Sequence, residues 1–180
     1  MLKKMMWSSS GVLLIVISLA FASGHNRAPD AVTRATDWNQ YEGELSVLSD
    51  GKHPENSTDP AVFIWPAKGI LIFEFEHPVE LVQVRIYVGE ESGGYILSAY
   101  LGGHAEDSGG RDPEGDLIAN IENAEYVTDG WTVLGLPPGT VVDNLELSTF
   151  GEAYFYEIEL LGPEPTSIEP ATWGRVKRMR

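Results

Sequence analysis

The stretch LIFEFE at residues 71–76 decides the fold class, because it alternates large apolar residues with glutamates. Successive side chains of an extended chain point to opposite faces, so its leucine and two phenylalanines share one face and its two glutamates share the other. The stretch VQVRIYV at residues 82–88 repeats the alternation. This period of two predicts strands with one buried and one solvated face. The pair His77-Pro78 is expected to end the first of these strands.

Further short strands with the same alternation follow along the chain, separated by Gly, Pro, Asp and Asn. No amphipathic helix of useful length lies between them, so the chain is predicted to be all-β, an antiparallel β-sandwich or barrel. The segment Gly102–Gly115 is rich in glycine and charge and is expected to be a surface loop. The further strands are residues 95–101, 131–134, 145–147 and 154–160, the last with Tyr154, Tyr156, Ile158 and Leu160 facing inward and Glu157 and Glu159 outward.

The N-terminus has the pattern of a secretory signal peptide over residues 1–22. Lys3 and Lys4 give a positive start, an apolar run covers residues 11–19, and Ala20-Phe21-Ala22 has the small-residue spacing of a cleavage site. The apolar run is shorter than the roughly 20 residues that a membrane-spanning helix needs, and no later segment is apolar enough. The alternative left open is an uncleaved N-terminal anchor. The protein is expected to be secreted, or to lie in the cell envelope or the periplasm.

Composition divides the rest of the chain into three parts. Residues 23–40 are polar and patternless and are expected to be a leader, residues 41–162 form the single predicted sandwich domain, and residues 163–180 are a tail that is first proline-rich and then basic. The chain has no cysteine, which excludes disulfides, a lipid-modified N-terminal cysteine and a thiol nucleophile. Such a domain must rest on its hydrophobic core alone.

The charge of the chain is strongly negative, with 12 basic and 27 acidic residues. An acidic body argues against a nucleic-acid partner, because phosphates require a basic face. It suits a soluble protein that binds cations or neutral polymers, although solubility alone would also explain it. The basic, Trp-containing tail is expected to contact an anionic surface, to fold back on the acidic body or to be read by a sorting machine; an inert tail remains an alternative.

The order of these motifs resembles the galactose-binding-like jelly-roll superfamily, which includes discoidin or coagulation-factor type-C domains and carbohydrate-binding modules. The resemblance rests on the Asp50-Gly51 turn followed by Thr58 and Trp65, and on three strand-like segments at residues 72–78, 81–88 and 155–162. It implies a jelly-roll fold and a carbohydrate ligand. The sequence departs from the superfamily at residues 99–103, where AYLGG replaces the usual Ser-Asp-Gly-x-x-Trp stretch, so the ligand transfers less safely than the fold.

The resemblance also implies one structural calcium ion, held by Asp50, Thr58, Glu157 and backbone carbonyls around Lys52. Calcium prefers six to eight hard oxygen ligands, and a tight turn containing Gly51 can supply carbonyls. The alternative is that Asp-Gly is only a common turn pair and Glu157 an exposed strand residue.

Four residues near loops or strand ends are candidates for sugar binding, which favours aromatic faces beside a few polar groups. They are Tyr95, His104, Arg111 and Trp131. Each could instead be an edge of the core or a residue that only aids solubility.

Sequence patterns of catalysis are missing from the chain. It contains no His-x-x-x-His zinc pair, no Gly-x-Ser-x-Gly elbow and no phosphate-binding Gly-Lys-Ser/Thr loop. Glu74 and Glu76 could be imagined as a glycosidase pair, but any alternating strand provides that spacing. The sequence therefore predicts a secreted, non-catalytic module that binds carbohydrate or a cell-surface protein. The alternative is a structural or adhesive component of a cell envelope or matrix.

Overall fold

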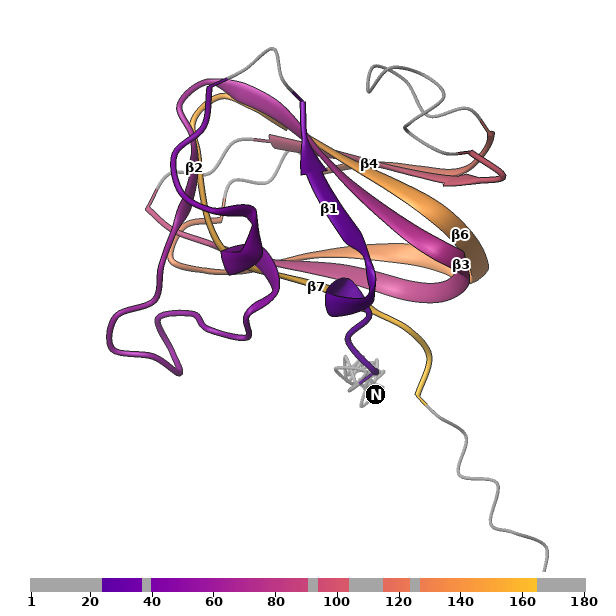
Figure 1. Cartoon of the computed structure of the whole chain (residues 1–180), viewed down its shortest axis with the longest axis horizontal. Coiled ribbons are helices and arrows are strands. Elements are labelled where there is room, and N and C mark those ends of the chain that lie inside the picture. Colours follow the sequence, from indigo (N-terminus) through magenta and orange to yellow (C-terminus); the bar gives the residue numbers. More distant parts are fainter. Residues whose placement is uncertain (1–23, 37–39, 91–93, 104–114, 124–126, 165–180) are drawn as a thin grey trace, which may run out of the picture.

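The computed structural model describes residues 24–36, 40–90, 94–103, 115–123 and 127–164 (Figure 1). It contains seven strands, all paired antiparallel, and two short 3-10 helices within these ranges. The strands are β1 Val32–Ala35, β2 Phe63–Trp65, β3 Lys68–Val88, β4 Gly94–Leu101, β5 Asp116–Asn123, β6 Gly130–Phe150 and β7 Ala153–Leu161, and the helices are η1 Ala28–Asp30 and η2 Leu45–Ser49.

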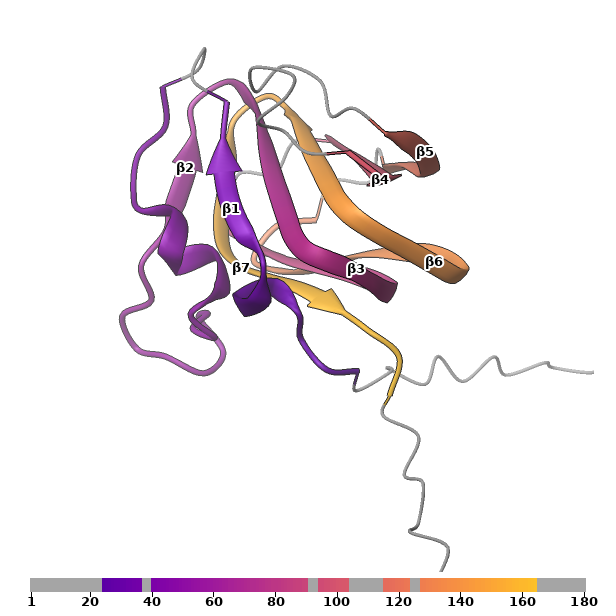
Figure 2. The same ribbon diagram turned by 45° about the vertical axis from the view of Figure 1, so that its right-hand side comes forward.

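Two long strands, β3 and β6, pass through both layers of a sandwich (Figures 1 and 2). Residues 68–74 of β3 pair with residues 144–150 of β6, and with β1, β4 and β5 they form the first sheet, ordered β1-β3-β6-β4-β5. Residues 83–88 of β3 pair with residues 130–135 of β6, and with β7 and β2 they form the second sheet, ordered β2-β7-β3-β6. The predicted all-β antiparallel sandwich is confirmed.

The bend between the layers lies at a place that the sequence analysis interpreted as a strand end. His77-Pro78 does not stop the strand; β3 continues through it, with a break in the register between Glu74 and Val79. Proline has no backbone N–H, so the pairing is interrupted there while the chain stays extended. The two short strands expected at residues 131–134 and 145–147 are likewise parts of one continuous strand, β6.

The core fills the space between the sheets and contains the predicted inner rows of β3 and β4. Leu71, Phe73 and Phe75 are buried, as are Tyr95, Leu97 and Ala99 of β4, whereas Leu101 at the end of that predicted row is half-buried. In β7 the predicted row is wrong in its first half, where Phe155 is buried and Tyr154 and Tyr156 are only half-buried. A bulge opposite Tyr87 and Val88 shifts the alternation by one residue, so the inward side changes along the strand.

The predicted leader is also corrected, because residues 24–36 belong to the fold. The Asn26 side-chain oxygen accepts the Leu160 N–H at 3.0 Å, and β1 pairs with residues 71–74 of β3. This segment looks patternless because β1 is a four-residue edge strand with no residue of its own fully buried. Within the described part of the chain no helix is long and apolar enough to cross a membrane.

Candidate functional site

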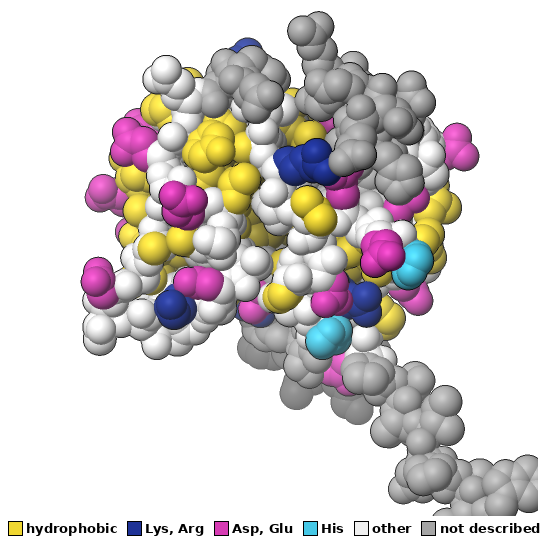
Figure 3. All heavy atoms as spheres, viewed as in Figure 1, with side chains coloured by type: hydrophobic (Ala, Val, Ile, Leu, Met, Phe, Trp, Pro, Cys, Tyr) yellow, Lys and Arg dark blue, Asp and Glu magenta, His cyan; other side chains and the backbone are white. Residues whose placement is uncertain are grey.

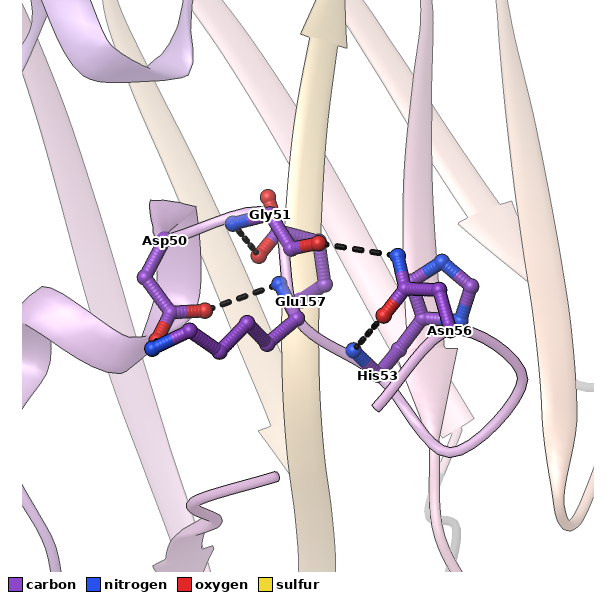
Figure 4. A network of polar contacts seen from close by, with 6 residues as sticks. Asp50, Gly51, His53, Asn56 and Glu157 are labelled. Atoms are coloured by element: carbon purple, nitrogen blue, oxygen red, sulfur yellow. Dashed lines mark hydrogen bonds and ion pairs between the residues drawn. The ribbon is translucent and has the colours of Figure 1, made fainter. Parts of the chain in front are cut away.

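A tight turn at Asp50–Asn56 lies against the outer face of the second sheet (Figure 4). It follows η2 directly, and Gly51 adopts a φ of 76°, the left-handed conformation that favours glycine. An Asp50 side-chain oxygen accepts the Lys52 N–H at 2.9 Å. The Asn56 side chain closes the turn by accepting the His53 N–H and donating to the Gly51 carbonyl, each at 2.9 Å. The turn is therefore held in shape by its own polar groups.

Glu157 of β7 joins this turn to the sheet. Its Oε2 accepts the Gly51 N–H at 2.8 Å, and the side chain reaches up to the turn from the strand (Figure 4). As predicted, Glu157 lies on the outer side of the strand, yet it is only 1 % exposed. The alternative of an exposed strand residue is wrong, because the turn covers the carboxyl group. Its second oxygen, Oε1, is buried without a hydrogen-bond partner.

Burial raises the pKa of the Glu157 carboxyl to about 8. The charges of Asp50 and Glu159 raise this pKa further, while the backbone N–H groups of Gly51 and Lys52 oppose the rise. A carboxylate at this position therefore lacks a compensating positive charge. Either a proton or a cation would supply it.

The residues expected to hold calcium are brought together only in part. Asp50, Lys52 and Glu157 meet at the turn, whereas Thr58 is exposed and shows no hydrogen bond in the described structure. The unpartnered Oε1 of Glu157 beside the charge of Asp50 fits a cation. The Lys52 ammonium lies 3.4 Å from Asp50 Oδ2 and competes for that oxygen. Within the described ranges no three His, Cys, Asp or Glu side chains form a metal-binding group.

An aromatic cluster adjoins the turn on the same sheet face. The rings of His53 and Tyr87 stack at a centroid distance of 4.9 Å, and Trp131 meets both edge-on at 5.1 and 5.2 Å. The Arg85 guanidinium lies 4.2 Å from the centre of the Trp131 ring and forms a 2.9 Å ion pair with Glu159. The cluster thus fixes the turn to the sheet by packing as well as by the Glu157 hydrogen bond.

The four predicted sugar-binding residues have different outcomes. The prediction for Tyr95 is wrong, because this side chain is fully buried and packs 6.0 Å from the Phe155 ring. Tyr95 lies in the inward row of β4, which its alternation with Ile96 already indicated. Trp131 is partly exposed, but Arg85 and two rings contact it. His104 and Arg111 lie outside the described residues.

Two exposed aromatic residues were missed by the sequence analysis. Phe150, the last residue of β6, is 51 % exposed, and Tyr41 is 39 % exposed. Leu147 and Thr149 are buried, so the alternation along the strand places Phe150 on the side that faces away from the core. The sequence predicts the outward position of Phe150 only if the strand is extended from Leu147 to Phe150.

Comparison with models of known protein families finds no match, and comparison with curated proteins finds none either. Solved structures do match. A fucose-binding module of Streptococcus pneumoniae, SpX-3, has a TM-score of 0.55 at 13 % identity, covering 78 % of this chain and 99 % of that module. A chitosan-binding module of a Paenibacillus chitosanase/glucanase has a TM-score of 0.56 at 13 % identity, covering 77 % and 99 %.

A third match is the family 32 carbohydrate-binding module of Clostridium perfringens NanJ, solved with galactose. Its TM-score is 0.54 at 11 % identity, and the alignment covers 76 % of this chain and 97 % of that module. These modules have the galactose-binding-like jelly-roll fold, and so does this chain. At such low identity the likeness establishes the fold alone.

Proposed function

We propose that this chain is an exported, non-catalytic carbohydrate-binding module. The fold supports the proposal, because the matching structures are modules whose names state fucose, chitosan or galactose as ligand and which align over nearly their whole length. Export is supported by the charged start, apolar run and Ala-x-Ala pattern of residues 1–22.

Phe150 is the observation that carries the proposal. It is the most exposed Phe, Tyr or Trp side chain among the described residues, and in the sheet it lies between Lys68 of β3 and Gly94 of β4. Ser148 lies two residues away on the same outer face, and Glu122 of β5 is exposed nearby in the register. An apolar ring beside hydroxyl and carboxylate groups is the usual composition of a sugar site.

Glu74 and Glu157 are both held by other contacts and are not placed to act as catalytic acids. Glu74, half of the imagined glycosidase pair, forms a 2.9 Å ion pair with Arg34. Glu157, whose pKa is raised to about 8, is enclosed between the turn and β7, where no substrate can reach it. A general acid needs both a tuned pKa and access to the scissile bond.

We propose further that Glu157 and Asp50, with carbonyls of the turn, hold one structural calcium ion. The unpartnered buried oxygen of Glu157 and the neighbouring charge of Asp50 support this. The ion would supply the positive charge that this carboxylate lacks and would tie the turn to β7. Thr58 is not part of the proposal, because among the described residues it shows no hydrogen bond to Asp50 or Glu157.

A structural or adhesive role is the second candidate, and β5 is the observation that favours it. Among the described strands it is the outermost of the first sheet (Figure 2), and its Leu117 and Ile118 are 55 % and 41 % exposed. The backbone groups of an edge strand with exposed apolar side chains can hydrogen-bond with a strand of another molecule.

A glycan array probed with the chain from Ser23 onwards separates the two roles. We expect selective binding that Phe150→Ala weakens at least tenfold, while Val133→Ala, another exposed apolar strand residue, has no effect. Absence of glycan binding, combined with self-association that Leu117→Lys abolishes, would support the adhesive role instead.

A further inference from the structure

The outer face of the first sheet carries an ordered run of side chains along β6 and its neighbours. Leu145, Leu147 and Thr149 are buried in the core, so residues 144, 146, 148 and 150 of β6 point to the outer face. The register places Gly94 beside Phe150, Ile96 beside Ser148, Ser98 beside Glu146, and Tyr100 beside Asn144. Phe150 and Tyr100 therefore lie at the two ends of this face; Phe150 is exposed, whereas Tyr100 is partly buried and Asn144 beside it is fully buried.

The distance between these ends suits an extended ligand. Six residues separate the row of Phe150 from the row of Tyr100, which corresponds to about 20 Å at a rise of roughly 3.3 Å per residue. Phe150 is half exposed and Tyr100 is partly buried. A single sugar ring would cover only a fraction of this length.

Polar groups occupy the rows between the two rings. The Asn120 side-chain nitrogen of β5 donates to the Ser98 hydroxyl at 3.0 Å, which fixes both groups on the outer face. Asn120 itself is exposed, and its row also contains Glu146 of β6. The next row combines Ser148 with the half-buried Ile96 and the exposed Glu122. Hydroxyl, amide and carboxylate groups above an apolar floor complement the hydroxyls and C–H faces of sugars.

The charge of the molecule limits the kind of chain that this face can accept. The protein has a formal net charge of −15, and acidic side chains outnumber basic ones on the surface seen in Figure 3. On the face itself Glu122 and Glu146 are acidic, while Lys68 lies beside Phe150 and Arg34 of β1 lies in the row of Glu146, so the excess of negative charge is that of the whole protein. Polysaccharides with uronate, sulfate or phosphate groups would be repelled.

We propose that the outer face of the first sheet binds a linear polysaccharide that lacks acidic groups, with the chain running from Phe150 towards Tyr100. This inference rests on the proposed carbohydrate-binding function and specifies its ligand. The sugar units stack on Phe150 at one end and hydrogen-bond with Ser148, Asn120 and Glu146 along the strand direction. Affinity then rises with the length of the polysaccharide.

Isothermal titration calorimetry with linear oligosaccharides of increasing length tests the proposal. The probes are cello-oligosaccharides and N-acetylated chito-oligosaccharides as neutral series, chitosan oligosaccharides as the amino-bearing series, and oligogalacturonates as the acidic series. We expect affinity in at least one non-acidic series to rise about tenfold or more from the dimer to the hexamer. The acidic series should not bind.

Variants connect the binding to this face. Phe150→Ala and Asn120→Ala should each reduce hexamer affinity, by about tenfold and about fivefold, because one ring contact and one hydrogen bond are lost. Val133→Ala on the second sheet is the matched control and should bind as the unaltered protein does. Since all three side chains are exposed, unchanged circular dichroism and melting confirm that each variant is folded.

Two results would overturn the inference. Sugar binding that is independent of chain length and unaffected by Phe150→Ala and Asn120→Ala would place the ligand elsewhere and leave the proposed function intact. Failure of every series, together with an empty glycan array, would overturn both the inference and the proposed function.

Discussion

Replacing Glu157 by glutamine should make the protein more stable at alkaline pH when no cation is present. The folded-state pKa of about 8 lies above the ordinary value of 4.5, so the neutral carboxyl favours the folded state. The stability that it contributes is fully present below pH 4.5 and is lost as the pH rises through 8. At about 1.4 kcal/mol per unit, the loss is on the order of 4–5 kcal/mol. Glutamine cannot ionise and avoids this loss.

Urea unfolding in chelator from about pH 5 to about pH 9 measures the effect. The free energy of unfolding of the unaltered protein should fall with pH by several kcal/mol more than that of Glu157→Gln. Glu76→Gln, at an exposed position on β3, is the control and should follow the unaltered protein. Parallel curves for the unaltered protein and Glu157→Gln would show that Glu157 ionises without cost and would refute the reasoning.

Calcium extends the same experiment. If Asp50 and Glu157 bind the ion, millimolar calcium should restore the stability of the unaltered protein near pH 8, by about 2.7 kcal/mol at one hundred times Kd. Glu157→Gln should respond weakly, and magnesium should substitute poorly because it requires a tighter octahedral shell. Equal unfolding curves in calcium and in chelator would leave the turn held by hydrogen bonds alone.

Three other outcomes are expected. Gly69→Ala should lower the melting temperature by roughly 5–10 °C, because a Cβ there would overlap the buried Trp65 ring, whereas Gly135→Ala, which meets no atom within 4 Å, should not; equal melting of the two variants would contradict this packing. Phe73→Asp should abolish the strand spectrum in circular dichroism, because an unpaired core charge costs several kcal/mol out of a total of roughly 5–15; a folded variant would contradict the position of the core. Mass spectrometry of exported protein should find Ser23 at the N-terminus, and detection of Met1 would reject cleavage.

The fold class and the inner rows of β3 and β4 could be predicted from the sequence, because alternation reports burial directly. Strand ends could not. A residue such as Pro78 stops hydrogen bonding locally, but β3 continues beyond it since its two halves pair with different parts of β6. The four-residue strand β1 carries little alternation, because it is an edge strand that buries few side chains. The bulge in β7 likewise depends on its pairing with β3 and has no local signal.

The candidate site was predictable where a turn motif marked it. Asp50-Gly51 indicated a sharp turn, and the structure places that turn against Glu157, 106 positions away in the chain. What the sequence could not report is that the turn buries the Glu157 carboxyl. The prediction for Tyr95 is wrong for a different reason. It was taken as exposed because it lies near a strand end, although the alternation of the strand places it on the same buried face as Leu97.

The measurement that tests the account most directly is the length dependence of oligosaccharide binding by the unaltered protein and by Phe150→Ala. A carbohydrate-binding module that uses the outer face of the first sheet should bind a non-acidic hexamer at least tenfold more tightly than the dimer, and Phe150→Ala should remove most of that gain. An unaltered, folded protein that binds no oligosaccharide of any length would contradict the central claim.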